Sequence, residues 1–303
     1  MKIDDYLSRA DVVRFTAKSD LHALRLVVGN WLFIGLIFAF VAQWTNPLTL
    51  LIAVPLLAGR QLGLSVLMHD CGHRTLFRTQ WMNDVLGQWL CALPVLNDQP
   101  SYARGHLEHH RRAGSHDDPD LPNYAAYPIP RTSFRRKVVR DLTGQTGFKL
   151  LKAIVKRGAS GVLSREASRG SVVTFKQIFV QIVIFAALAV AGIAWAYLLW
   201  AVAYLTVFML IVRVRQVAEH AAVPDLYDPD VRHNTRTVDA PWWQKWVFAP
   251  FGVNYHLEHH FMASVPCYRL KALRQHLLQA GALDDVPRFT GYKQLIDHAV
   301  LPV

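Results

Sequence analysis

Charge is scarce in this chain, and two long stretches have none. Only 18% of the 303 residues are charged, whereas 52% are hydrophobic. Residues 26–59 and 177–212 contain no Lys, Arg, Asp or Glu. A helix needs roughly 20 apolar residues to cross a bilayer, so each stretch is long enough for two spans joined by a short turn. This composition argues against a pair of long soluble core helices and favours a membrane protein.

Cysteine is also scarce, and its spacing carries no motif. The three cysteines, Cys71, Cys91 and Cys267, have no paired spacing, so neither a disulfide framework nor an Fe–S motif is indicated. Residues 1–25 are polar and of mixed charge, and the apolar run after them is too long for a signal peptide. We therefore expect no cleaved signal at the N-terminus.

Turn signals divide each charge-free stretch in two. Thr45-Asn46-Pro47 is a turn signal in the first stretch, and Gly192 is the expected break before Trp195 in the second. We therefore expect an all-α integral membrane protein with one domain over 1–303. Its four expected spans lie near 25–44, 48–68, 174–191 and 195–213.

The basic residues are distributed unevenly, which predicts the orientation in the membrane. The net charge is +11, yet the two tight turns hold no Lys or Arg, whereas residues 69–171 hold sixteen. Positive charge favours the cytoplasmic side. We therefore expect two hairpins whose cytoplasmic parts form a helical cap: 1–24, 69–173 and 214–303. The basic charge has no nucleic-acid-binding module around it, so we expect no nucleic-acid partner.

Eight of the fourteen histidines fall in three short clusters. These are His69-Asp-Cys-Gly-His73, His106-Leu-Glu-His109-His110 and His256-Leu-Glu-His259-His260. Residues i, i+3 and i+4 share one face of a helix, so each cluster should aim two or three imidazoles at a common point. Neutral imidazole is the commonest side-chain metal ligand. Eight imidazoles are too many for one ion, which indicates two metals, all on the expected cytoplasmic side.

Two other classes of metal protein fit the sequence less well. A metal transporter needs polar groups at the bilayer midplane, whereas these clusters lie at or beyond the ends of nearly apolar spans. A zinc metalloprotease would carry His-Glu-x-x-His, which this chain lacks. Imidazole ligands alone would suit iron, zinc, copper or nickel.

The three clusters, in this order around two apolar hairpins, resemble the integral-membrane fatty acid desaturase and hydroxylase superfamily. The likeness extends from about residue 30 to 280. The run Asn254-Tyr255-His256-Leu257-Glu258-His259-His260, followed by Ser264-Val265-Pro266 and Tyr268-Arg269-Leu270, resembles acyl-lipid desaturases in particular. The resemblance implies a non-haem di-iron centre that activates O₂ and removes hydrogens from an unactivated alkyl chain.

The resemblance also implies a ninth ligand, His220, after the fourth span. Related enzymes carry an Asn four residues before it that reaches the metal through water; this chain has Gln216 there. Gln216 and Asn254 are therefore candidates for supporting the metal site. The expected ligands of two iron ions are His69, His73, His106, His109, His110, His220, His256, His259 and His260.

Acidic residues stand next to several of these histidines. A ligating His usually donates its second N–H to a carboxylate or carbonyl. Each neighbouring acid could do this, although a residue at i±1 points away from the face of its neighbour, so pairing with another cluster or with an arginine is the alternative. These candidates are Asp70, Glu108, Glu219 and Glu258.

The resemblance favours desaturation of a fatty acyl chain on a membrane lipid. A hydroxylase or ketolase acting on an alkane, sterol or carotenoid is the alternative. The reaction needs O₂ and two electrons, and the chain has no flavin, haem or His-Pro-Gly-Gly sequence of a fused cytochrome b5 domain. We therefore expect an external donor, ferredoxin in a bacterium or cytochrome b5 otherwise, and a multi-pass protein of the bacterial inner membrane.

Overall fold

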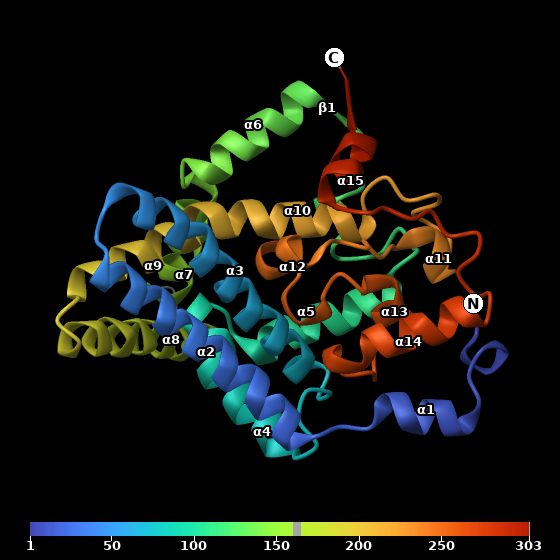
Figure 1. Ribbon diagram of the computed structural model, residues 1–303, viewed down its shortest axis with the longest axis horizontal. Coiled ribbons are helices and arrows are strands. Elements are labelled where there is room, and N and C mark those ends of the chain that lie inside the picture. Colours follow the sequence, from blue (N-terminus) through green and yellow to red (C-terminus); the bar gives the residue numbers. More distant parts are fainter. Residues whose placement is uncertain (160–164, 303) are drawn as a thin grey trace.

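The computed structural model describes residues 1–159 and 165–302, and helices dominate it (Figure 1). In this part of the chain the only strands are β1 (Ile129–Pro130) and β2 (Val300–Leu301), which pair in parallel. The expected cytoplasmic segments 69–173 and 214–303 include residues 160–164 and 303, which lie outside the described residues.

The longer helices follow one another in chain order. They are α1 (Arg9–Thr16), α2 (Asp20–Gln43), α3 (Pro47–Gly72), α4 (Gln80–Leu86), α5 (Gln99–Arg112), α6 (Arg131–Leu142), α7 (Gln145–Ala159), α8 (Arg165–Val190), α9 (Tyr197–Ala203), α10 (Met209–His220), α11 (Val231–Asn234), α12 (Trp242–Phe248), α13 (His256–Phe261), α14 (Cys267–Gln279) and α15 (Tyr292–Ala299). Short helical turns connect them: η1 (Ile3–Asp5), η2 (Gly87–Ala92), η3 (Leu93–Val95), η4 (Leu121–Asn123), η6 (Ala194–Ala196), η7 (Tyr204–Phe208) and η8 (Pro250–Gly252).

Four helical stretches of the described chain are long and apolar enough to cross a membrane, as the sequence predicted. They are Arg9–Gln43, Pro47–Gly72, Gly170–Val190 and Ala194–His220. The second and fourth run past their expected ends at 68 and 213, because backbone hydrogen bonding continues through the polar residues that follow the apolar run. The histidines of the first cluster and His220 therefore lie on or next to the ends of the same helices that form the spans.

Both expected turns are confirmed, and each has a local cause. The Asn46 side chain accepts hydrogen bonds from the backbone N–H groups of Leu48 and Thr49, and Pro47 occupies the first turn of α3. This combination is a strong helix start signal. Gly192 follows α8 with φ +76°, a left-handed conformation that glycine adopts without strain.

Helix α3 is the central helix of the molecule. In its most apolar window 61% of the residues are buried inside the protein, against 22% for the span Gly170–Val190 in α8. Leu57, Leu62 and Leu64 of α3 pack in one hydrophobic cluster with Trp200 and residues of α10. The apolar surface of α8 must therefore be covered by lipid, whereas α3 is covered by protein.

Residues 86–96, which are apolar but too short to span, turn back after η2 and η3. Leu96 ends η3 with φ +54°, and α5 starts shortly afterwards, with the Asp98 side chain accepting from the backbone N–H of Ser101. The segment lies tightly on α3: a Cβ on Gly87 would be 2.5 Å from Cβ of Cys71. This close approach helps place α5 across the end of α3.

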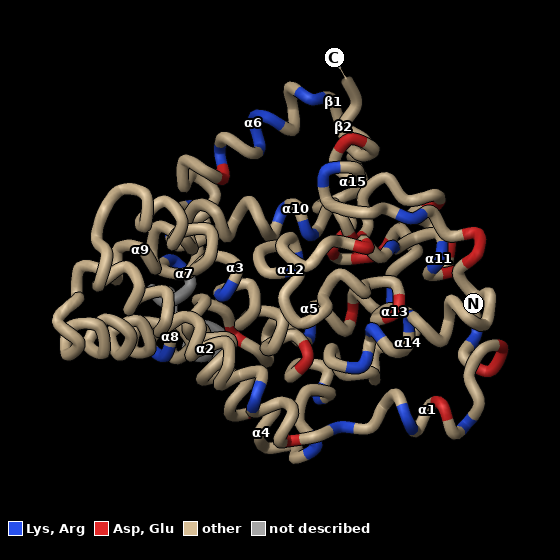
Figure 2. The backbone as a smooth tube through the Cα atoms, in the orientation of Figure 1, with Lys and Arg blue, Asp and Glu red and all other residues tan. Residues whose placement is uncertain are grey.

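Charged side chains avoid one end of the molecule. Figure 2 shows the region around α8 and α9, and the turn between α2 and α3, almost without Lys, Arg, Asp or Glu. The charges gather on α6 and around α1, α11 and α14 at the other end. The fold thus separates an apolar helical part from a charged part.

Candidate metal centre

Four separate parts of the chain bring histidines to one region at the end of the spans. His69 lies in the last turn of α3 with His73 just after it, and His220 is the last residue of α10. The two His-Leu-Glu-His-His sequences form the end of α5 and most of α13. These helices lie close together in the middle of the molecule (Figure 1).

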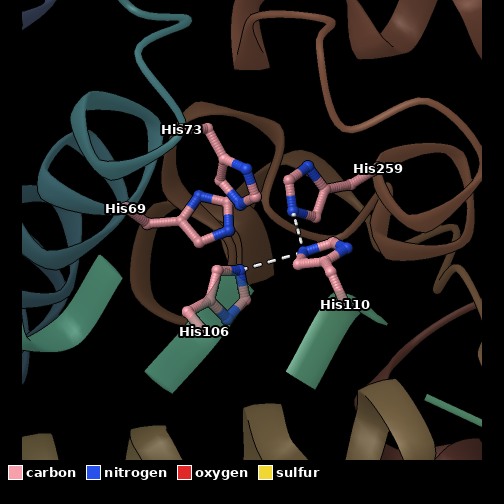
Figure 3. A group of neighbouring side chains, drawn as sticks. All are labelled: His69, His73, His106, His110 and His259. Atoms are coloured by element: carbon pink, nitrogen blue, oxygen red, sulfur yellow. Dashed lines mark hydrogen bonds between the residues drawn. The ribbon is translucent and has the colours of Figure 1, made fainter. Parts of the chain in front are cut away.

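The first group holds five histidines from α3, α5 and α13, whose ring nitrogens all lie within 4.8 Å of one another. Figure 3 shows the five rings pointing toward a common centre. The Nε2 atom of His110 lies 3.0 Å from that of His106 and 2.9 Å from that of His259. The members are His69, His73, His106, His110 and His259.

The second group holds four histidines, again with nitrogens within 4.8 Å of one another. The Nε2 atoms of His256 and His220 lie 2.8 Å apart. The rings of His109 and His260 complete the group, with centroids 5.0 Å apart. The structure thus gathers all nine expected histidines, including His220, into two compact groups.

The two repeated sequences are shared between the groups, which corrects one expectation. We expected each cluster to aim at one common point. Instead, the i and i+4 histidines of each repeat join one group and the i+3 histidine joins the other. With about 100° per residue, positions i and i+4 differ by about 40°, whereas i+3 lies about 60° to the opposite side. Because α5 and α13 lie between the two groups, this divergence lets each helix serve both.

The nitrogens fit a bound cation and fit each other poorly without one. The Nδ1 atoms of His109 and His220 face acceptors, Oδ1 of Asp118 at 2.8 Å and the carbonyl of Asn234 at 3.0 Å, which assigns the ring proton to Nδ1. Nε2 then carries a lone pair that points into its group. Two nitrogens about 2.1 Å from one ion and at right angles lie about 3.0 Å apart. The measured separations of 2.8 to 3.0 Å match this.

Burial keeps the imidazoles in the neutral form that binds metals. It lowers the pKa of His73 to about 3 and that of His110 to about 2, with neighbouring histidines adding to the shift of each. Burial also holds the pKa of His106, His256 and His259 well below the usual value. The Nε2 atoms of His73 and His260 are buried and have no hydrogen-bond partner. Both groups therefore present free lone pairs at neutral pH.

Two of the four neighbouring acids contact a histidine. Oδ1 of Asp70 lies 3.0 Å from Nδ1 of His69, its own neighbour in the chain, and its other oxygen accepts from the backbone N–H of Cys267 at 2.6 Å. Glu219 lies 3.5 Å from Nδ1 of His256 in a different cluster. Our expectation that an i±1 neighbour points away is therefore wrong for Asp70, which sits where α3 ends.

The other expected supporting residues make different contacts. Glu108 pairs with Arg111 at 2.8 Å and with Arg112. Glu258 is buried and binds Arg274 at 2.6 Å and the Thr237 hydroxyl at 2.5 Å. These two acids brace the histidine helices without touching a ring.

The two amide candidates also differ in position. Asn254 donates to the Val238 carbonyl at 3.0 Å, ahead of the third cluster. Gln216 lies one helical turn before His220 and lines the cavity that borders the second group. Gln216 is thus the amide that faces the space beside the histidines.

Asp118 supports the site, although the sequence indicated only a turn at 117–120. Its carboxylate accepts from His109 and from the Tyr124 hydroxyl, and burial is offset by these bonds, so that the pKa of Asp118 is lowered. No local pattern distinguished Asp118 from Asp117 or Asp120, because its partner lies nine residues away across a turn.

The remaining five histidines lie outside both groups. His22 stacks on Tyr268 and His116 on Tyr227. His233 pairs with Asp228, whereas His276 and His298 contact backbone carbonyls. The structure assigns them ordinary packing roles, as the sequence reading expected.

A cavity of about 510 Å³ borders the histidines. His106, His109, His220 and His256 form part of its wall. Polar side chains face it near the histidines, and apolar ones farther away. The polar residues include Ser101, Tyr102, Asp120, Asn123, Arg215 and Gln216.

A second, mostly apolar cavity of about 410 Å³ continues the first between α7, α8 and α9. The two cavities share Leu96, Ile154, Gln177 and Tyr204 as lining residues. Tyr204 belongs to η7, where the helix widens by one residue per turn between α9 and α10. An apolar passage therefore leads from between the spans to the histidines.

The family model described as Fatty acid desaturase matches residues 42–292. That range includes the second, third and fourth spans and all nine histidines of the two groups.

Individual relatives share about a quarter of their residues with this chain. The dihydrorhizobitoxine desaturase of Bradyrhizobium elkanii is 26% identical over 249 residues, 79% of this chain and 69% of that protein. The sn-1 oleoyl-lipid 12-desaturase of a Picosynechococcus is 26% identical over 74% of this chain and 68% of the relative. A shorter match, 29% identical over 34% of this chain and 28% of the relative, joins it to the sn-1 acyl-lipid omega-3 desaturase (ferredoxin) of a Nostoc.

Replacing Asp118 by Asn should weaken metal retention. The amide keeps the shape of the side chain but loses the charge that holds the His109 ring, so we expect about 10–100-fold lower metal affinity or activity. Asp117→Asn is the matched control, because the Asp117 side chain is 80% exposed and its partner is Arg112 at 3.8 Å. Metal content after dialysis against a chelator measures the effect; equal retention in the two variants would contradict it.

Proposed function

Because the chain belongs to the fatty acid desaturase family, we propose that it holds two iron ions in its two histidine groups and desaturates a long acyl chain carried by a membrane lipid. The family and the apolar spans make it a membrane-bound oxidoreductase. The observation that carries the finer proposal is the convergence of five and four histidines on two adjacent points.

The nine histidines would be the ligands of the two ions, five for one and four for the other. When bound, the irons would supply O₂ activation: with two electrons and two protons from outside, O₂ takes two hydrogens from neighbouring carbons and leaves a double bond and two waters. Iron as the metal is supported by the family and by a purely imidazole donor set, which suits several first-row metals. Asp70, Asp118 and Glu219 would orient the rings.

The protein's own contribution is positioning and exclusion of water. An alkyl chain lying in the apolar cavity between α7, α8 and α9 would reach the histidines through the shared opening beside Tyr204 and Gln177. Apolar walls hold a chain without reacting with the oxidant and keep bulk water out. The passage lies between the spans, which favours a substrate that arrives from the bilayer.

Two named relatives support a lipid substrate, and one supports the electron donor. Their names specify sn-1 oleoyl-lipid and sn-1 acyl-lipid desaturation, the second with ferredoxin. The relative named for dihydrorhizobitoxine indicates that the family also includes a desaturase named for another compound. We propose that this chain works on acyl lipid with ferredoxin as donor, in a bacterial inner membrane with the histidines on the cytoplasmic side.

Expression in a host without this activity should lighten a fraction of the membrane-lipid acyl chains by two hydrogens. The His259→Ala variant should lose the product and bound metal, because it removes a nitrogen from the five-membered group. His116→Ala, outside both groups, should keep both. Lipid mass spectrometry makes the measurement. Oxygenated terpenoid, sterol or alkane with unchanged acyl chains would overturn desaturation in favour of hydroxylation or ketone formation.

Turnover should require a separate reduced carrier, and it should fall with rising salt when that carrier is limiting. The net charge of +11 attracts an acidic donor, and exposed charges are screened beyond about 8 Å at physiological ionic strength. Initial rates at two salt concentrations, with limiting and saturating ferredoxin, test this. Turnover with O₂ and NADPH alone would refute the need for a carrier.

Single cysteines should report opposite sides of the membrane at the two ends of the spans. The three native cysteines are buried, so background labelling should be low. Ala191→Cys, exposed in the turn after α8, should react with an impermeant reagent added outside, and His116→Cys should react only after permeabilisation. External labelling at position 116 would reject the cytoplasmic placement of the histidines.

A further inference from the structure

A groove of about 480 Å³ lies between α2, α3 and α12, and the proposed function does not use it. Leu26, Gly29 and Phe33 of α2 form one wall, and Trp242 and Trp246 of α12 form another. On α3 the groove touches Arg60, whereas the histidine cavity touches Leu62, Ser65 and Met68. These positions lie on different faces of the helix, so the groove and the catalytic passage are separate.

The groove is lined by three cations. Arg25, Arg60 and Lys245 all contribute to its surface, and none of its described lining residues is acidic. Lys245 also lies over the Tyr255 ring, 5.5 Å from its centroid. Such a concentration of positive charge without a carboxylate is complementary to an anion.

Arg60 is the most demanding of the three. It lies within the second span, is only 6% exposed, and carries a charge that is costly to bury without an opposite charge. Its hydrogen bonds go to neutral oxygens: Oδ1 of Asn30 at 3.4 Å and the carbonyl of Trp246 at 2.5 Å. The Trp246 ring adds a cation–π contact at 5.2 Å. These partners orient the guanidinium but do not neutralise it.

The surroundings indicate that the anion belongs to a lipid. The tryptophans Trp242, Trp243 and Trp246 of α12 are 75%, 55% and 41% exposed, as expected of side chains at a membrane interface. Beyond the groove, the outer face of α2 continues as exposed apolar residues, including Leu32 and Leu36, each 62% exposed. A ligand with a charged head and an apolar tail matches this sequence of surfaces.

The depths of the cations also match a lipid. Arg25 lies 19 residues from Trp44 at the first turn, and Arg60 lies 14 residues from Asn46. At about 1.5 Å per residue, Arg60 is about 8 Å deeper in the membrane than Arg25. Arg25 and Lys245 could thus face a phosphate while Arg60 faces the ester oxygens below it.

We propose that this groove binds the head of an anionic phospholipid, with Arg25 and Lys245 holding the phosphate. Bound lipid would fasten α12 to α2 and α3. Helix α12 leads through η8 directly into α13, which carries the third histidine cluster. The lipid is therefore a structural ligand of the membrane boundary, distinct from the acyl chain that reaches the histidines.

A glycine in the groove provides a test that leaves every charge in place. A Cβ on Gly29 would meet no atom within 4 Å, so a larger side chain there should fill the groove without disturbing the protein. Gly35 is also on α2 and also has nothing within 4 Å, but it lies outside the groove. Gly29→Leu and Gly35→Leu are therefore matched variants, with the same change and the same gain in helix propensity.

The experiment is native mass spectrometry of the full chain after reconstitution in nanodiscs made of equal parts phosphatidylcholine and phosphatidylglycerol. The wild type and Gly35→Leu should retain phosphatidylglycerol in preference to phosphatidylcholine, and Gly29→Leu should lose that preference. Arg25→Gln and Lys245→Gln should each weaken retention about fivefold, since one basic residue near an anionic surface contributes that much.

Three results would overturn the proposal. They are equal retention of the two lipids by the wild type, undiminished retention by Gly29→Leu, and displacement of the lipid by millimolar glycerol phosphate. The last result would identify a soluble phosphate as the ligand. Product formation is not measured here, so failure of the lipid site leaves the desaturase proposal untouched.

Discussion

Burial of nine neutral imidazole rings in two compact groups is the constraint on which the rest of the structure depends. Their nitrogens approach to 2.8–3.0 Å with lone pairs facing one another. Buried polar atoms without partners are costly, and a shared cation removes that cost for a whole group at once. Metal binding and assembly of these helices are therefore one process, because neither group is complete until residues from α3, α5, α10 and α13 meet.

The crossed use of the two repeats strengthens that coupling. Helix α5 supplies His106 and His110 to one group and His109 to the other, and α13 does the same with its own triplet. Neither ion could therefore be held by one hairpin with one cap helix. Asp118 and Glu219 hold rings from outside the groups, and each comes from a different segment than a simple reading of the repeats would suggest.

Helix α3 organises the membrane side of the protein through its separate faces. One face borders the passage toward the histidines, its end carries His69, and another face presents Arg60 to the groove beneath α12. Packing explains why this helix is so thoroughly buried: a Cβ on Gly59 would lie 2.9 Å from the Trp246 carbonyl, so α12 rests directly on its backbone. Helix α8, by contrast, keeps an apolar surface for lipid.

The sequence alone determined the features that arise from neighbours in the chain. Apolar run length predicted four spans, Asn46-Pro47 and Gly192 predicted the turns, and helical spacing singled out eight histidines. His220 required a family resemblance, since one histidine at a helix end has no local pattern. Tertiary structure decided how the repeats divide between two groups, and that Asp118 and Glu219, but not Glu108 or Glu258, contact histidines. It also decided where the passage and the groove lie. These depend on distances between helices remote in sequence, which packing sets and local periodicity does not encode.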